Sequence, residues 1–243
     1  MQSRIEIAAA YRSRPGGPPG SGRTVVRSIR AGHHLAARET GPGVVHLVGT
    51  AAGPLGGDDV TIAVHLGPGA RLALRSAGAT IVLPGGRVSD SRMHLLFTVA
   101  DGAELDVGCE PTVICHRADH ESSAVLDLAG SGQVRLLEQV VLGRAGEPGG
   151  HWAGRTRVTR DGRPELRHTV RSSVAATDGV RVISTLLRTG IEARPATSGA
   201  AVAMRLAAGG LLVTATGTDL IPTRHDLLAA ERKATTVVPA LSG

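Results

Sequence analysis

The side chains best suited to metal chemistry, Cys109, Cys115, His116 and His120, fall in one short segment. Thiolate and imidazole groups are ligands for zinc, copper or nickel. The spacing matches no compact zinc module, in which paired cysteines lie about two to four residues apart. Cys109 falls on the apolar phase of a predicted strand, so both cysteines are more simply interpreted as small buried hydrophobic residues. The His33–His34 pair is a second, weaker candidate and is more typical of an exposed loop.

Three carboxylates have unusual sequence surroundings. Asp58 and Asp59 follow a glycine pair just before a predicted strand. They are interpreted either as polar residues at the start of the strand or as carboxylates on a rim that contacts a cation or an arginine-bearing partner. Glu138 interrupts an apolar strand and points to its apolar side if the alternation of Val134 and Leu136 continues. A buried carboxylate is costly unless it is paired or faces a water-filled channel. The alternatives for Glu138 are a strand slip, a bulge or an internal salt bridge.

The sequence contains no recognisable catalytic motif. It lacks a nucleophile elbow, a phosphate-binding loop and a zinc-protease helix motif. We therefore expect a protein that is not an enzyme.

Arginine dominates the charge of the chain. The formal net charge is +6, and Lys233 is the single lysine. Arg155, Arg157, Arg160 and Arg163 lie on the two arms of one predicted hairpin, either as a solvated strand face or as a docking surface for a protein partner. Nucleic acid is not expected as a partner, because one Tyr, one Phe and one Trp cannot form a stacking platform.

Period-two alternation predicts a mainly β protein. Apolar positions alternate through 60–66, and a turn at 67–69 leads to a second alternating segment, which we interpret as a hairpin. Similar units recur about 30 residues apart, with turn glycines at Gly69, Gly102 and Gly132. This repeat predicts stacked strands, as in a β-helix-like solenoid or a layered sandwich.

The remaining segments complete a single predicted domain over 1–243. Asp161-Gly162 is a strong signal for a hairpin turn. Residues 223–233 form the best helix candidate, with Thr223 as N-cap, so we expect one or two short helices near the C-terminus. The Pro- and Gly-rich segment 13–22 predicts a flexible loop between two strands.

Localisation is expected to be cytoplasmic, without membrane association. No apolar run approaches the roughly 18–20 residues that cross a bilayer. The first ten residues do not resemble a secretory signal, and two cysteines are too few for a disulfide scaffold.

The order of short motifs resembles the urease accessory protein family UreD, also called UreH. The stretch 46–58 is similar to the family segment that ends in Gly-Gly-Asp. The further matching segments are 67–71, 78–80, 100–103, 110–114, 135–138, 142–144, 160–163 and 211–233. No one of these motifs is decisive, and the resemblance rests on their order and spacing.

The resemblance implies a β-helix-like maturation factor that helps deliver nickel to the urease active site. The implied partners are the urease apoprotein and the accessory protein UreF, with UreG reached through UreF. It implies no tightly bound cofactor and at most transient nickel. Asp58 and Glu138 match acidic positions of a proposed internal nickel passage. Two alternatives remain open: a β-solenoid binding module without a metal role, and a metal-dependent enzyme that uses Cys109, Cys115, His116 and His120.

Overall fold

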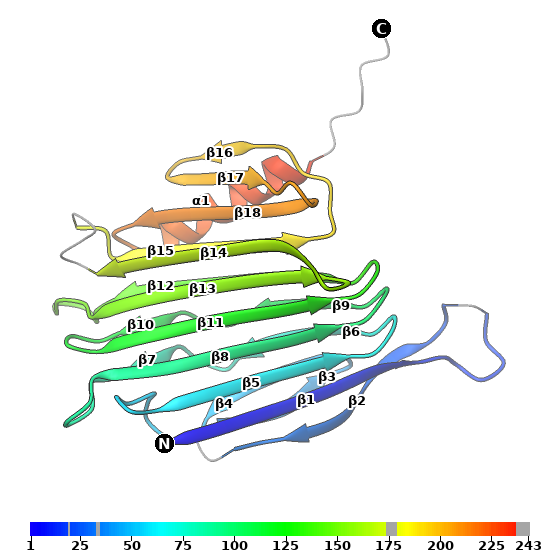
Figure 1. Cartoon of the computed structure of the whole chain (residues 1–243), viewed down its shortest axis with the longest axis horizontal. Helices are drawn as coiled ribbons and strands as arrows, with labels where there is room; N and C mark the ends of the chain where they lie inside the picture. Colours follow the sequence, from blue (N-terminus) through cyan, green and yellow to red (C-terminus); the bar gives the residue numbers. More distant parts are fainter. Residues whose placement is uncertain (19, 33–34, 174–178, 237–243) are drawn as a thin grey trace, which may run out of the picture.

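The fold consists of two facing β-sheets and one helix (Figure 1). It is seen in a computed structural model that describes residues 1–18, 20–32, 35–173 and 179–236. The first sheet contains β1 (Gln2–Arg12), β2 (Arg23–Arg30), β5 (Asp59–Leu66), β8 (Asp90–Val99), β11 (Asp119–Leu128), β13 (His151–Arg160) and β14 (Arg163–Ser173). Its strand order is β14-β13-β11-β8-β5-β1-β2.

The second sheet is longer and follows the order β16-β17-β18-β15-β12-β9-β6-β4-β3. These strands are β3 (Leu35–Gly41), β4 (Val44–Gly49), β6 (Arg71–Ser76), β9 (Glu104–Gly108), β12 (Gln133–Leu142), β15 (Val182–Thr189), β16 (Ala196–Ser198), β17 (Ala201–Arg205) and β18 (Gly210–Gly217). Two short strands, β7 (Thr80–Val82) and β10 (Thr112–Ile114), continue the lines of β6 and β9.

The stacked, β-helix-like architecture is confirmed, but the three expected hairpins are wrong. The chain passes from β5 to β6, from β8 to β9 and from β11 to β12, and each step crosses from one sheet to the other. Each strand pairs in parallel with its equivalent in the next turn of the coil. Gly69 and Gly102 adopt positive φ angles of 67° and 65° in these crossings, a conformation that favours glycine. The segments before and after each turn therefore face each other across the core.

The fourth hairpin is confirmed. β13 and β14 pair antiparallel, with Arg160 opposite Arg163. Asp161 and Gly162 both have positive φ angles, 47° and 77°, as a two-residue type I′ turn requires. This hairpin ends the parallel stack of the first sheet.

The main core lies between the two sheets and is almost entirely aliphatic. Phe97 is its only aromatic member, packed with Ile5, Ile7, Leu74, Leu105 and Leu126, each no more than 2% exposed. The strands of the stack contribute alternate residues to it, because only one face of each sheet is turned toward the other.

One helix occurs within the described residues, α1 (Leu220–Thr235). It begins before the expected start, and Thr223 lies inside it, buried, with its hydroxyl donating to the Asp219 carbonyl oxygen at 2.6 Å. Thr223 is therefore not the N-cap. The apolar side of α1, centred on Leu227, packs on the outer face of the second sheet over β15 and β18. On the same face Arg135 donates two hydrogen bonds to the Glu231 carboxylate, at 2.9 Å each.

Two further expectations concern the loop at 13–22 and membrane-spanning segments. The described residues of 13–22 connect β1 to β2, as expected. None of the described helical residues forms a span long and apolar enough to cross a membrane.

Candidate functional site

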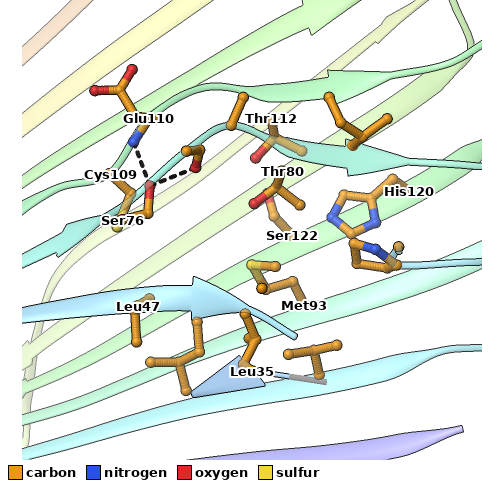
Figure 2. Close-up of a pocket in the computed structure, with 18 of the residues that line it drawn as sticks. Leu35, Leu47, Ser76, Thr80, Met93, Cys109, Glu110, Thr112, His120 and Ser122 are labelled. Carbon is orange, nitrogen blue, oxygen red and sulfur yellow. Dashed lines mark hydrogen bonds between the residues drawn. The ribbon is translucent and has the colours of Figure 1, made fainter. Parts of the chain in front are cut away.

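A cavity of about 640 Å³ lies between the two sheets. It forms where the second sheet is interrupted, at 77–79 between β6 and β7 and at 109–111 between β9 and β10. The two interruptions are tied together by Ser76, whose hydroxyl accepts from the Glu110 backbone NH and donates to the Gly78 carbonyl oxygen, both at 2.9 Å (Figure 2). Segments 77–79 and 109–111 do not form strands of the second sheet, and the short strands that follow them place small side chains such as Thr80 and Thr112 at the cavity wall.

Glu138 lines this cavity from β12. Its neighbours on the inner face, Leu136 and Val140, belong to the buried cores on either side, so the alternation predicted from the sequence continues through it. The Ser122 hydroxyl, which comes from the opposite sheet, donates to Glu138 Oε1 at 2.6 Å. Burial raises the pKa of Glu138, and this effect outweighs the hydrogen bond from Ser122, which lowers it. Burial thus disfavours the charged carboxylate, and a positive charge nearby would favour it.

Trp152 extends this contact into a chain of three residues. Its indole Nε1 donates to the Ser122 hydroxyl oxygen at 3.2 Å. Because an indole NH can only donate, the Ser122 proton is directed to Glu138. Gly154 provides the room for the indole, since a Cβ atom there would lie 2.4 Å from Trp152 Cζ2.

His120 lies beside Ser122 on the inner face of β11 and also lines the cavity (Figure 2). Its Nδ1 lies 2.9 Å from the Ser91 hydroxyl oxygen. Burial lowers the pKa of His120 to about 4, so the ring is neutral at neutral pH. A neutral imidazole does not repel an incoming cation.

Asp58 lines the same cavity as Glu138. Its Oδ1 lies 2.9 Å from the Met1 ammonium nitrogen, and its Oδ2 accepts a hydrogen bond from the Leu55 backbone NH at 2.8 Å. The structure therefore brings both carboxylates indicated by the resemblance to one internal space.

The four sulfur and imidazole candidates are not gathered into one site. Cys109 lines the cavity, and burial raises the pKa of its thiol to about 11. Cys115 is buried and is not among the cavity-lining residues, and its pKa is also raised by burial. His116 is exposed, whereas His120 is buried. In the part of the chain that the structure describes, no three His, Cys, Asp or Glu side chains are grouped to hold a metal ion. The His33–His34 pair lies outside the described residues.

The four arginine candidates differ in their surroundings. Arg155 pairs with Glu121 of β11. Arg160 is mostly buried, pairs with Glu165 at 2.6 Å and donates to two backbone carbonyl oxygens of the neighbouring turn. Arg157 and Arg163 are exposed. Arg160 therefore holds the hairpin to the stack and is not free to bind a partner.

Sequence reasoning did not identify Ser122, Trp152 or Ser91 as members of the site. A signal for Ser122 was available, because the alternation of Leu126 and Leu128 extends back to Ser122 on the same face of β11. Trp152 had no such signal, since its contact with Ser122 depends on the parallel alignment of β11 with β13.

Comparisons with known proteins agree with the resemblance. The model of the UreD urease accessory protein family matches residues 10–239. The urease accessory protein UreD of Frankia alni is 45% identical over 141 residues, which cover 56% of this chain and 47% of that protein. The urease accessory protein UreD 1 of Saccharopolyspora erythraea is 34% identical over 244 residues, which cover 93% of this chain and 91% of that protein. UreD of Streptomyces coelicolor is 35% identical over 226 residues, covering 85% and 89% of the two chains. The chain therefore belongs to the UreD family of urease accessory proteins, which are maturation factors and not enzymes.

Proposed function

We propose that this urease maturation factor passes nickel through its internal cavity, with Glu138 as a transient ligand and Asp58 as a second carboxylate on the route. The observation that supports this proposal is the placement of the Glu138 carboxyl group inside the cavity between the sheets. A carboxyl group in an apolar interior destabilises the fold unless it is compensated. A role in binding nickel explains why a carboxyl group is present at this position.

The chemistry of the cavity suits passage better than storage. Burial raises the pKa of Glu138, which favours the protonated form of its carboxyl group. A divalent cation would bind with release of that proton. Ser122, Thr80 and Thr112 add neutral oxygen atoms along the cavity wall. These oxygen ligands and the single imidazole of His120 bind nickel more weakly than a set of several thiolates and imidazoles does, so the ion can leave.

The Cys109 thiol would otherwise be the strongest ligand at the cavity. Its pKa of about 11 keeps it protonated at neutral pH, and the thiolate is the form that binds metals. This arrangement limits trapping of the ion.

The proposed partners are the urease apoprotein and the accessory protein UreF, with UreG reached through UreF. Their support is family membership. The proposed setting is the cytoplasm, because both cysteines are free thiols, as in a reducing compartment.

The test compares Glu138→Gln and Asp58→Asn with a matched control, Glu121→Gln, which removes a carboxylate on β11 outside the cavity lining. Each variant is co-expressed with the urease apoprotein and the partner accessory proteins. Co-elution measures assembly, and urease activity after nickel addition measures maturation. We expect all three variants to assemble and only the two cavity variants to lose activation, by about ten-fold or more for Glu138→Gln. Full activation by both cavity variants would refute the passage. Failure of the wild-type chain to assemble would refute the maturation role itself.

A further inference from the structure

The outer face of the β13–β14 hairpin carries exposed arginines that face each other. Arg157 of β13 lies directly opposite Arg167 of β14 in the antiparallel pair. Arg171 follows on the same face of β14, opposite Ala153. All three side chains are exposed. We call Arg157, Arg167 and Arg171 the arginine face.

The arginine face lacks the neutralisation that neighbouring arginines have. Arg155 is paired with Glu121, and Arg160 is paired with Glu165. Within the described ranges, no carboxylate forms an ion pair with any of the three arginines of the face. On its other side Arg157 lies beside Val125 of β11, and its diagonal neighbour Asp127 accepts a hydrogen bond from the Thr159 hydroxyl.

Like charges directly opposite each other in an antiparallel pair destabilise the sheet. A guanidinium is also the side chain best suited to binding a carboxylate through two parallel hydrogen bonds. Among the described residues, the positive charge of the arginine face is thus not balanced by an ion pair, and the face lies at the border of the first sheet, where β14 is the last strand (Figure 1).

We propose that the arginine face is a docking surface for a carboxylate-rich face of a protein partner in the maturation complex. This inference rests on the proposed function and adds to it the chemistry of one contact. The partner's Asp or Glu side chains would separate Arg157 from Arg167 and pair with each of them.

The structure disfavours two other occupants. A second copy of the chain, docked through the same face, would bring arginine against arginine. Single-stranded nucleic acid requires aromatic side chains for stacking, whereas Phe97 and Trp152 are buried and Tyr11 is in β1, at the far side of the same sheet.

The experiment reverses the charge of the opposed pair with Arg157→Glu/Arg167→Glu. The matched control is Arg23→Glu/Arg27→Glu, which makes the same charge change at two exposed arginines on β2, at the other edge of the same sheet. A milder variant, Arg157→Gln/Arg167→Gln, serves if the reversal affects folding, which circular dichroism monitors. Binding of each purified chain to the urease apoprotein, with and without the co-expressed accessory proteins, is measured at about 50 mM and about 300 mM salt.

We expect the reversal to weaken binding by about ten-fold or more at low salt and to flatten its salt dependence, with little change in the control. The glutamine variant should show a smaller loss. Unchanged binding by both hairpin variants, with normal binding by the wild type, would overturn this inference and leave the proposed function intact. Equal losses in hairpin and control variants would overturn it too, because net charge alone would then be the cause. Wild-type affinity for a DNA duplex equal to that for the protein partners would also overturn it, whereas absence of any wild-type binding to the protein partners would overturn the proposed function.

Discussion

The packing of α1 on the second sheet can be tested at a single side chain. Leu227 of α1 is completely buried between the helix and the sheet, where it packs among Leu186, Leu211 and Val213. Ile221 lies on the same helix and is 82% exposed. Leu227→Ala removes buried methyl groups and leaves a cavity, whereas Ile221→Ala removes a similar side chain from solvent.

The expected difference is large compared with the stability of a protein domain. Leu→Ala substitutions at fully buried sites lower the free energy of unfolding by about 3 kcal/mol. Exposed substitutions stay within about 0.5 kcal/mol. With a urea m-value of about 3 kcal/mol/M, the Leu227→Ala variant should unfold at a urea concentration about 1 M lower than the wild type.

Urea unfolding followed by tryptophan fluorescence measures this difference. Trp152 is the only tryptophan, and it lies in a different core cluster from Leu227. A shift in its transition therefore reports that the helix and the β-stack unfold as one cooperative unit. Equal midpoints for Leu227→Ala and Ile221→Ala would refute the described docking of α1. A shift seen by circular dichroism but not by fluorescence would refute the single cooperative unit.

Two further predictions concern the cavity wall. Burial lowers the pKa of His120 from 6.5 to about 4. Between these two values the unfolded chain binds a proton at this residue and the folded chain does not. The free energy of unfolding therefore decreases as the pH falls through this range. The wild type should lose about 2 kcal/mol from this residue between about pH 7.5 and about pH 5. His120→Gln should lack that part of the loss in urea titrations at the two pH values, and an identical pH dependence would contradict the buried, neutral ring. Gly154→Ala should displace the Trp152 indole, because the new Cβ would lie 2.4 Å from the ring. We expect a red-shifted emission maximum and about 1–3 kcal/mol of destabilisation, and an unchanged spectrum would show that the indole does not lie over Gly154.

Local features of the sequence determined the elements and the direction of single side chains. Alternation identified the strands, and the same alternation placed Glu138 on the inner face, because successive residues of a strand point to opposite faces. Asp161-Gly162 specified a hairpin, since only a few residue types adopt two consecutive positive φ angles. The helix was predicted with its start displaced, because helix boundaries depend on backbone hydrogen bonds such as that from the Thr223 NH to the Asp219 carbonyl oxygen.

The tertiary structure alone decided which strands pair and what surrounds the buried carboxyl group. Alternation shows which face of a strand is buried, but not whether the chain turns back within one sheet or crosses to the other, since both bury the same residues. For this reason the crossing from β5 to β6 resembles a hairpin in sequence. The chain of contacts from Trp152 through Ser122 to Glu138 joins three strands and both sheets. Its geometry depends on the alignment of successive turns of the stack, a long-range property that no local pattern of residues encodes.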